Sequence, residues 1–524
     1  MEIDLAHLDS TQSTPLRAHV CIIGTGIAGL TLAHKLTQFG ADVLLLEAGG
    51  RTKSTSPANE VIQRGYPHPG TSESRVQALG GTSLTWGGQL LPLPQDSNWP
   101  IPTAELAPFT AEAEHLLGVD DLPYDAPAFF THLQQRLPAL LQQLPLLELT
   151  LSKFAPFAHR NLAHTLGHEL RAHANTRILL HARATELLLS LSRDAIEAVL
   201  VRSPAGHTHR IEATHIVLAA GTIETARLLL ASRSIAPEGV GNRRDQVGRN
   251  FHDHLTFTAA TLHPPARARI LSALRPWVYG HTLHSLKLIA SRELRDQLDL
   301  TPVLAHLTID EPESSGIAAL RNILRARQQG SLAASLRASL PHLPQALRDA
   351  ALLAWSARIR RRRYISPQAT VLLRLNAAQQ TPSASRITLS SELDSLAQPK
   401  AVLDWRIDPR ELATLRAFAA HLRAQLEPAN LTGLDWNPSL FTPDPSAPIA
   451  NLDDARHAMG GTSMGADPHT SVVTPELRVH GLRNLFIASA AVFPDGSPQL
   501  PTLPLMALTL RLAQHLHQQH RTED

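Results

Sequence analysis

The sequence predicts an α/β fold, and three observations carry this prediction. An apolar run at 20–23 leads directly into a glycine-rich turn, GTGIAG at 24–29. The next residues, 30–39, have helical spacing, and a second apolar run at 41–46 ends on Glu47. A strand, a glycine turn, a helix and a second strand in this order are typical of the Rossmann unit, which binds a dinucleotide.

Each glycine of the turn has its own task. Gly24 permits a tight turn, Gly26 lets the backbone approach a pyrophosphate, and Gly29 lets the helix pack closely on the strand. The amino end of the helix offers free N–H groups and the positive end of its dipole to the phosphates. Glu47 follows about 20 residues later, where its carboxylate can accept hydrogen bonds from a ribose diol. The motif predicts dinucleotide binding but does not separate FAD from NAD.

Three other segments have weaker patterns. Residues 1–16 are polar and predict a frayed end. Residues 51–78 show no clear period and contain several Pro, Gly and Ser, which predicts a long surface excursion. Such an excursion is uncommon unless it is functional or covers something. Segment 177–218 predicts three short strands, at 177–186, 195–202 and 211–219, with a turn at 203–206.

Composition narrows the class of protein. The 524 residues exceed what one compact core usually holds, so two domains or one large composite domain is expected. The net charge of +2 argues against a nucleic-acid-binding surface. The single cysteine, Cys21, excludes a disulfide framework and suits a reducing compartment. The acidic first residues do not resemble a secretory signal, and no apolar run could span a membrane. These features predict a soluble, cytoplasmic protein.

Further motifs follow in a fixed order along most of the chain. They are GGTSLTWGG at 80–88, VLAAGTIETAR at 217–227, VGRNFHDH at 247–254, and HAMGGTSMG at 457–465, which precedes RVHGLRNLFIA at 478–488, VFP at 492–494 and PTL at 501–503. Their order and spacing resemble the glucose–methanol–choline (GMC) oxidoreductases. The similar branch contains the pyranose oxidases and the large subunits of gluconate and fructose dehydrogenases.

The resemblance implies the cofactor, the architecture and a set of binding residues. The expected cofactor is FAD, held in a Rossmann-type domain assembled from 17–90, 170–256 and 450–524. The expected substrate domain, 91–169 and 257–449, is an antiparallel β-sheet flanked by helices. The residues implied to bind FAD are Gly24, Thr25, Gly26, Ile27, Ala28, Gly29, Glu47, Ala48, Gly81, Thr82, Ser83, Gly87, Gly88, Ala184, Ala220, Gly221, Glu224, Ala491, Pro501 and Thr502.

The implied activity is oxidation of an alcohol (a CH–OH donor) by hydride transfer to flavin N5. His457 stands where the family has its catalytic base, a task for which histidine is suited. The family normally has a second His or Asn just before the PTL motif, but here that residue is Leu500, which cannot form hydrogen bonds. Gln499 is the substitute if the loop is shifted. Otherwise the site has one polar catalytic group, and the sequence leaves both interpretations open.

A second departure concerns the linkage to the flavin. Pyranose oxidases have a histidine immediately before the tryptophan of the glycine-rich loop, and it bonds the flavin covalently. Here that residue is Thr85, so non-covalent FAD is expected. No metal is expected either, because the adjacent residues 252–254 do not converge easily on one ion. No GxSxG motif follows a predicted strand, which excludes a Ser-His-Asp hydrolase of that type.

The segment 316–363 has two interpretations. It is rich in Leu, Ala and Arg, has helical spacing, and is interrupted near Pro341 and Pro344. It is either a lid over an apolar substrate channel, which requires an apolar cavity beside it, or a basic amphipathic surface for anionic lipid or a partner. The lid is favoured over membrane contact. Either interpretation suggests a substrate larger or more apolar than a simple sugar.

Three functions follow, in order of preference. The first is an FAD-dependent alcohol dehydrogenase or oxidase acting on a small-molecule alcohol. Its electron acceptor is oxygen, a quinone or a partner protein, and the sequence has no CxxCH haem motif of its own. The second is non-oxidative chemistry on the same scaffold, of the lyase or photochemical kind, which Leu500 favours. The third is a flavin-binding protein without activity, and the intact glycine motifs and His457 count against it.

Overall fold

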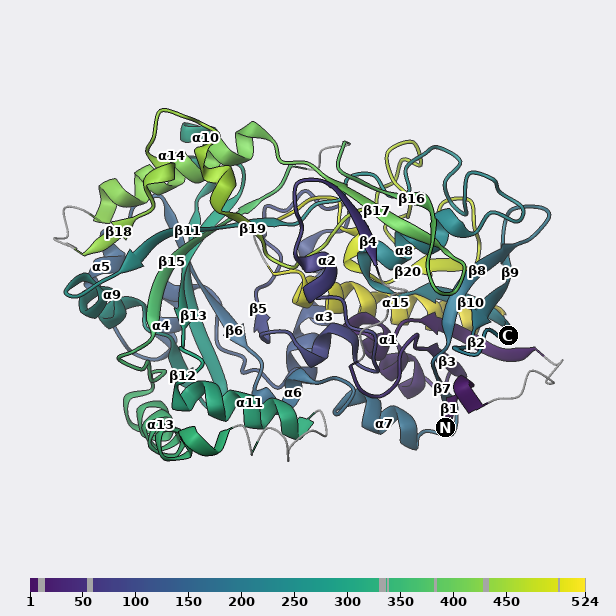
Figure 1. Ribbon diagram of the computed structural model, residues 1–524, viewed down its shortest axis with the longest axis horizontal. Coiled ribbons are helices and arrows are strands. Elements are labelled where there is room, and N and C mark those ends of the chain that lie inside the picture. The colour runs from purple at the N-terminus through teal and green to yellow at the C-terminus, as the bar shows by residue number, and fades with distance from the viewer. Residues whose placement is uncertain are drawn as a thin grey trace.

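Two large β-sheets lie side by side and determine the shape of the molecule (Figure 1). The eight-stranded sheet occupies the right of the view and the nine-stranded sheet the left. A third sheet of three strands lies near the top, beside the eight-stranded sheet. This computed structural model describes residues 1–7, 15–53, 60–328, 336, 339–380, 384–426, 433–497 and 500–523.

The eight-stranded sheet contains the Rossmann unit that the sequence predicts. Five strands, from β1 at the edge to β10, run parallel, and β9 and β8 continue the sheet in antiparallel pairing beyond β10. The last short strand, β20, pairs in parallel with β10. In order across the sheet the strands are β1 (Glu2–Asp4), β7 (Thr176–Leu180), β3 (Val43–Leu46), β2 (Leu16–Ile23), β10 (Thr208–Leu218), β9 (Ile196–Arg202) and β8 (Arg183–Leu189), with β20 (Leu485–Ile487) off this path.

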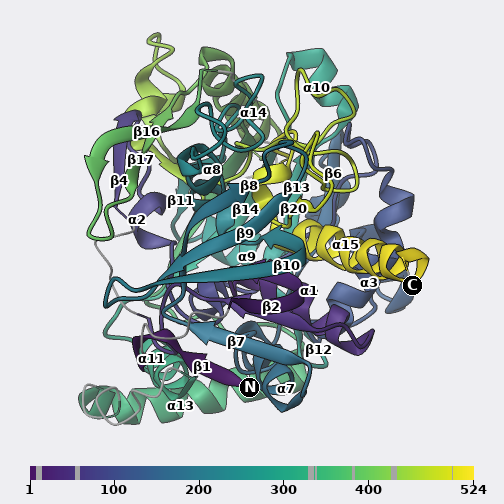
Figure 2. The ribbon, with the colours of Figure 1, turned by 90° about the vertical axis from the view of Figure 1, so that its right-hand side faces the viewer.

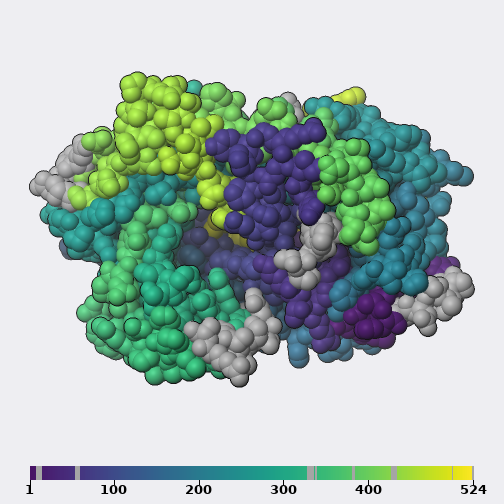
Figure 3. All heavy atoms as spheres, in the orientation of Figure 1, coloured from purple at the N-terminus to yellow at the C-terminus, as the bar shows by residue number. Residues whose placement is uncertain are grey.

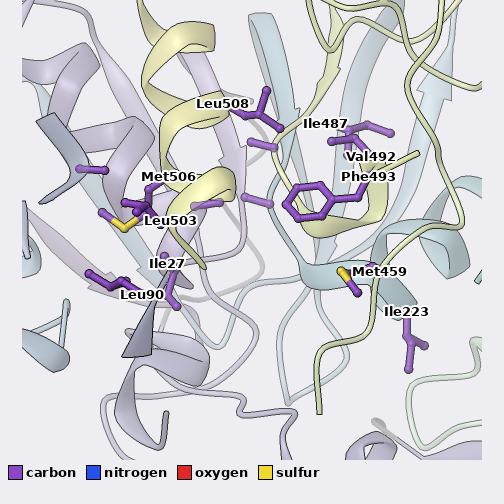
Figure 4. Close-up of a cluster of buried hydrophobic side chains, with 14 of the residues drawn as sticks. Ile27, Leu90, Ile223, Met459, Ile487, Val492, Phe493, Leu503, Met506 and Leu508 are labelled. Carbon is purple, nitrogen blue, oxygen red and sulfur yellow. The ribbon is translucent and has the colours of Figure 1, made fainter. Parts of the chain in front are cut away.

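Helices from both ends of the chain cover this sheet (Figure 2). Helix α1 (Ile27–Gln38) packs against α15 (Thr502–Glu523), which also packs against α3 (Thr103–Leu116). Apolar side chains of α1, β20 and α15 belong to one buried cluster, and Figure 4 shows Ile27, Ile487 and Leu503 within it. The first and last parts of the chain therefore share one core.

The nine-stranded sheet confirms the expected antiparallel sheet. Every pairing among its strands is antiparallel. The main path is β18 (Leu434–Trp436), β11 (His254–Leu262), β15 (Thr370–Ala378), β14 (Val303–Asp310), β13 (Thr282–Ala290), β6 (Leu147–Phe154) and β5 (Gln89–Leu90), with β12 (Trp277–Tyr279) and β19 (Leu452–Asp454) off it.

The remaining helices complete the two halves. The α-helices are α2 (Gly70–Glu73), α4 (Ala126–His132), α5 (Ala139–Gln142), α6 (Phe157–Arg160), α7 (Leu166–Ala172), α8 (Gly221–Ala231), α9 (Ala266–Leu274), α10 (Arg292–Leu298), α11 (Gly316–Gln328), α13 (Leu343–Trp355) and α14 (Pro409–Leu426). The short 3₁₀ helices are η1 (Leu5–His7), η3 (Gly81–Leu84), η4 (Leu340–His342), η7 (Pro438–Leu440), η8 (Ala447–Asn451) and η9 (Ala490–Val492), and η5 (Ser356–Arg360) is π-helical. No described helix is long and apolar enough to cross a membrane.

Three predictions about local structure need correction. The N-terminal segment is not frayed over 2–7, because β1 pairs with β7 and Leu5 is buried. The predicted strand 177–186 is two strands, since the backbone turns at His181, whose φ is +52°. The surface excursion 51–78 contains β4 (Val61–Gly65), which pairs with β17 in the third sheet. The strands of that sheet are β16 (Arg386–Leu393), β17 (Pro399–Trp405) and β4.

Candidate cofactor and active site

A cavity of about 670 Å³ is lined by residues of both large sheets. The surface is hollowed beside the dark purple segment that follows β4 (Figure 3). This segment lines the cavity with Gly70 and residues 73–77, so the predicted excursion does cover something. The volume lies within the usual range of small-molecule and cofactor sites.

The glycine turn lies at one wall of this cavity. Gly24 has φ +108°, and a Cβ there would lie 2.5 Å from the carbonyl oxygen of Ala219. At Gly29 a Cβ would lie 1.9 Å from the Gly24 carbonyl oxygen, so only glycine permits this approach of α1 to the turn. A Cβ on Gly26, by contrast, would meet nothing within 4 Å. Gly26 therefore leaves open space at the amino end of α1.

Most residues that the resemblance implies as FAD ligands line the cavity. Gly29, Ser83, Gly88 and Ala491 do not. Gly29 contacts the turn itself, and Ser83 lines a second, smaller cavity. The implied residues at the cavity wall are Gly24, Thr25, Gly26, Ile27, Ala28, Glu47, Ala48, Gly81, Thr82, Gly87, Ala184, Ala220, Gly221, Glu224, Pro501 and Thr502.

Glu47 is buried at the end of β3. Its carboxylate accepts hydrogen bonds from the Thr25 hydroxyl and, at 2.8 Å, from the Gly49 N–H. Burial raises the pKa of Glu47, although these hydrogen bonds act in the opposite direction. A carboxylate can accept about four hydrogen bonds, so Glu47 can still accept one from a ligand.

A cluster of arginines surrounds Glu224, and the sequence motifs did not predict it. Glu224 forms ion pairs with Arg75 (2.5 Å), Arg227 (2.8 Å) and Arg183 (3.8 Å). Burial would raise the pKa of Glu224, but the guanidinium groups of Arg227, Arg75 and Arg183 outweigh it and lower this pKa to about 2. All four side chains line the cavity. This wall is therefore cationic overall, which suits an anionic cofactor.

The residues present fit a dinucleotide. A Cβ on Gly26, Gly87 or Gly221 would meet nothing within 4 Å, so backbone lines open space at three places around the cavity. Gly24 and Gly26 line the cavity at the amino end of α1. Backbone N–H groups at this end of a helix favour phosphate oxygens. Glu47 and the arginine cluster supply polar groups at the same cavity.

His457 lines the cavity and is held by a second histidine. Its Nδ1 lies 3.1 Å from Nδ1 of His254, and Nε2 of His254 bonds the carbonyl oxygen of Ser497. A carbonyl oxygen only accepts, so Nε2 of His254 carries a proton. Burial and the neighbouring His457 lower the pKa of His254 to about 3, so His254 is neutral and its Nδ1 is an acceptor. Nδ1 of His457 therefore donates, and its Nε2 is the basic atom.

Asp253 ties this pair to the rest of the site. Its carboxylate accepts the backbone N–H of His457 at 2.8 Å and that of His254 at 2.6 Å. The Asp253 carboxylate also contacts His68, whose Nε2 lies 3.1 Å away, and Nδ1 of His68 lies 3.0 Å from Asp454. Burial opposes protonation of His68, but Asp253 and Asp454 outweigh it and raise its pKa. His68 comes from the segment for which the sequence predicted no defined structure.

Ligand atoms of several of these residues lie within 4.8 Å of one another. One group is Asp253, His254 and His457, and the other is His68, Asp253 and Asp454. Asp253 and His254 thus converge with His457, which is distant in sequence. The expectation that adjacent residues would not converge on one point did not include such a third residue. Hydrogen bonds link His254 to His457, the backbone N–H of His457 to Asp253, and His68 to Asp253. The absence of a metal remains a prediction.

Leu500 lines the cavity and belongs to an apolar cluster. It packs against Leu91, Ile289 and Leu304, the last two from β13 and β14. Its side chain therefore contacts the nine-stranded sheet. Gln499, the alternative polar partner, lies outside the described residues.

The predicted helices of 316–363 are present and adjoin a second cavity of about 210 Å³. The break near the two prolines is confirmed, because η4 and the start of α13 lie there. Apolar side chains of α11 and α13 line this cavity opposite Leu84, Trp86 and Phe157, with Arg160, Arg321 and Arg325 among them. The structure thus contains the cavity that the lid interpretation requires.

Comparison with known proteins adds three profile matches. Residues 159–256 and 381–509 match the GMC oxidoreductases, and residues 22–89 match the NAD(P)-binding Rossmann-like domain.

Similar curated proteins span the whole chain. A 6'''-hydroxyparomomycin C oxidase of Streptomyces lividus is 24% identical, over 95% of this chain and 91% of its own length. A paromamine 6'-oxidase of Streptomyces fradiae is 25% identical, over 94% and 90%. The fructose dehydrogenase large subunit of Gluconobacter japonicus is 24% identical, over 95% and 97%.

Solved structures share the fold. A pyridoxine 4-oxidase from Mesorbium loti superposes with a TM-score of 0.58 at 17% identity, covering 96% of this chain and 99% of that one. A formate oxidase of Aspergillus oryzae, in a structure concerned with FAD modification, gives 0.61 at 16% identity, covering 97% and 100%.

Proposed function

Because the chain belongs to the GMC oxidoreductases and is an FAD-dependent oxidoreductase, we propose that it oxidises an alcohol at the cavity that His457 lines. The observation that carries the proposal is the tautomer of His457. Its Nδ1 is occupied by His254, so Nε2 is left as a base at the wall of the cavity that also contains the glycine turn.

FAD would be held by the glycine turn and Glu47 on one side and by Gly81, Thr82 and Gly221 on the others. When bound, a flavin accepts a hydride at N5. Thr85 also lines the cavity, and a threonine hydroxyl is a poor nucleophile, so we propose that the FAD is not covalently attached. Acid precipitation of the holoprotein should release all of the flavin into the supernatant. Flavin retained in the pellet would contradict this.

The chain's own part in the reaction is to move a proton. The substrate O–H proton passes to Nε2 of His457. The hydrogen on the neighbouring carbon leaves with both bonding electrons, as the hydride that a flavin would accept, and a carbonyl product remains. Burial lowers the pKa of His457, so the imidazole is neutral and ready to accept near neutral pH. Nδ1 keeps its proton throughout, because His254 accepts from it.

An anaerobic titration tests the proposal. The purified holoprotein is mixed with primary alcohols, polyols, sugars and apolar alcohols while the visible flavin band is followed. We expect at least one class to bleach the band. If dithionite bleaches it and no alcohol does, alcohol oxidation is wrong and non-oxidative chemistry takes its place. Leu500 and its apolar cluster favour that second function, because they replace the polar partner that the family normally has.

Helix α13 supports a further proposal, a contact with anionic lipid. Exposed apolar side chains recur every three or four residues along η4, α13 and η5, and residues 340–363 contain six arginines and one aspartate, which is buried. Such a surface suits an anionic membrane. The four most exposed side chains of this stripe are Leu340 (60%), Leu347 (65%), Trp355 (46%) and Ile359 (69%).

Vesicle sedimentation tests this contact. We expect the protein to sediment with phosphatidylglycerol vesicles and not with phosphatidylcholine vesicles, and the double variant Leu347→Glu, Ile359→Glu to lose binding. Leu393→Glu is the matched control, since Leu393 is 56% exposed on β16. Equal sedimentation of the double variant and the control would contradict the proposal.

A further inference from the structure

The cavity has a second polar wall, which none of the sequence motifs includes. Lys287, His306 and Arg374 line the cavity from three adjacent strands of the nine-stranded sheet. The strand register pairs Lys287 with His306 and His306 with Arg374, so the three side chains form one row on one face. We refer to these three residues as the basic row.

Lys287 is buried and the other two residues of the basic row are half-buried, and none of the three forms an ion pair with a carboxylate of the described residues. Lys287 is only 3% exposed, and burial lowers its pKa to about 7. The pKa of His306 falls well below its usual value, first through burial and then through Lys287. Nε of Arg374 is buried without a hydrogen-bond partner among the described residues. Three basic groups thus crowd together at some cost in stability.

The acidic residues of the cavity are already engaged elsewhere. The Glu47 carboxylate accepts from Thr25 and Gly49. Glu73 pairs with Arg456, Asp454 with His68, and Glu224 with its arginine cluster. None of these four acids lies on β13, β14 or β15. The arginine cluster suits the anionic cofactor, so the basic row is a second basic wall of the cavity, on the side of the nine-stranded sheet.

On the opposite face of the same sheet, two basic residues have carboxylate partners. Lys153 of β6 lies beside His284 of β13 in the register. Nζ of Lys153 lies 3.0 Å from Glu114, and Nε2 of His284 lies 2.9 Å from Asp120. Lys153 and His284 thus have carboxylate partners on the face that packs against the protein, whereas no such pair forms at the basic row among the described residues.

We propose that the substrate carries an oxyanion, a carboxylate or a phosphate, and that Lys287, His306 and Arg374 bind it. Ammonium and guanidinium groups form charge-assisted hydrogen bonds with either oxyanion. This inference rests on the proposed alcohol oxidation, in which His457 accepts the proton from the same molecule's hydroxyl. It replaces the expectation of an apolar substrate for this cavity. The arginine cluster is assigned to the anionic cofactor. The basic row is therefore the wall that we assign to the substrate's oxyanion.

The basic row and the histidine pair lie at two places along the same part of the nine-stranded sheet. Arg374 pairs with Thr258 of β11, and His254 begins that strand. Four residues of strand span about 13 Å. Between them lies Asn376, which pairs with Thr256 and also lines the cavity. A substrate that lies between the long basic side chains and the histidine pair would place an oxyanion at one end and a hydroxyl at the other.

Binding to the holoenzyme tests the proposal with a charge series on one scaffold. The probes are glucuronate and glucose 6-phosphate, neutral glucose and cationic glucosamine, with glycerate, glycerol 3-phosphate and glycerol as a shorter series. The readouts are perturbation of the visible spectrum of the oxidised flavin and the thermal unfolding midpoint. We expect an anionic member to bind at least about 10-fold more tightly than its neutral counterpart. If glucuronate and glycerate give this effect the anion is a carboxylate, and if the phosphates do it is a phosphate.

Variants assign the effect to the basic row. Lys287→Met should lower affinity for the preferred anion by about 10- to 100-fold and leave affinity for the neutral probe unchanged, whereas Lys287→Arg should retain most of it. Lys400→Met is the control, because Lys400 lies on β17 and pairs with Glu60. If Lys287→Met does not fold, sulfate competition replaces it: sulfate should weaken binding of the anionic probe and spare the neutral one.

The outcomes separate this inference from the proposed function. If neither anion of either series binds more tightly than its neutral counterpart, the anion site is wrong, whatever alcohols reduce the flavin. If anions bind through Lys287 but no alcohol reduces the flavin, the anion site stands and alcohol oxidation is wrong. Equal loss of anion binding in Lys287→Met and Lys400→Met would also overturn the assignment.

Discussion

At the scale of single residues, His457 is the group on which the chemistry depends. Replacing it with alanine removes the base but leaves the cavity and its glycine walls. We expect His457→Ala to lower the rate of flavin reduction by about 10²- to 10⁴-fold while FAD stays bound. Stopped-flow reduction and the flavin spectrum measure the two quantities. Unchanged reduction would remove His457 from the mechanism.

His254 is a positioning residue for that base. His254→Phe keeps an aromatic ring of similar size but cannot accept from Nδ1 of His457. The protonated form of His457 then loses a hydrogen bond, so its pKa should fall further, and the acidic limb of the pH–rate profile should move to lower pH. We expect kcat to fall about 10-fold at an unchanged KM. A fall in kcat without any movement of the acidic limb would show a merely structural role.

Leu500 occupies the position of a missing polar partner. We expect Leu500→Asn to raise the rate of alcohol oxidation several-fold, because an amide can hold the substrate hydroxyl. The same change removes apolar contacts with Leu91, Ile289 and Leu304 and should cost about 1–3 kcal/mol of unfolding free energy. Leu500→Ala, which loses the contacts without adding a polar group, is the control for turnover. Equal turnover of the two variants would mean that residue 500 does not reach the substrate hydroxyl and that the pocket binds its substrate in a different geometry.

At the scale of elements, two glycines at the junction of β2 and α1 allow helix packing and cofactor binding to be tested separately. In Gly29→Ala the new Cβ would meet the Gly24 carbonyl oxygen, so α1 must shift, and we expect a loss of about 1–3 kcal/mol in unfolding free energy. Gly26→Ala is the matched variant: Gly26 has φ −71° and open space before it. Its apoprotein should be as stable as wild type, yet bind FAD more weakly. Chemical denaturation and flavin titration measure the two effects.

Prediction from sequence succeeded where the signal is local. The glycine turn, its strands and its helix follow one another in the chain, so spacing alone predicts them. The basic row lies on three strands between residues 282 and 378, and only their register brings Lys287, His306 and Arg374 together. A charged residue between leucines, as in both Leu286-Lys287-Leu288 and Leu373-Arg374-Leu375, was the available signal. The tautomer of His457 depends, through His254, on the carbonyl oxygen of Ser497, which lies 40 residues further along the chain. No sequence pattern predicts this contact.

At the scale of the whole molecule, the cofactor cavity joins the two large sheets. A ligand that binds only the folded state stabilises it by about 2.7 kcal/mol at a hundredfold excess over Kd. We therefore expect removal of FAD to lower the unfolding midpoint by several degrees, and added FAD to restore it. Differential scanning calorimetry of the holoprotein, the apoprotein and the reconstituted protein measures this. An apoprotein as stable as the holoprotein would mean that the flavin contributes little to joining the halves.

The order in which the chain leaves the ribosome bears on how this site forms. The cavity wall begins at Ile23 and is completed by Thr502 and Leu505, at the start of α15. A nascent chain therefore has the glycine turn long before it has Pro501, and α1 lacks the buried surface that α15 provides. We therefore expect FAD to bind only after α15 has been synthesised and has packed against α1. A chain truncated before Thr502 would lack α15 and expose apolar surface of α1, and we expect it to be bound by chaperones and proteases rather than by FAD.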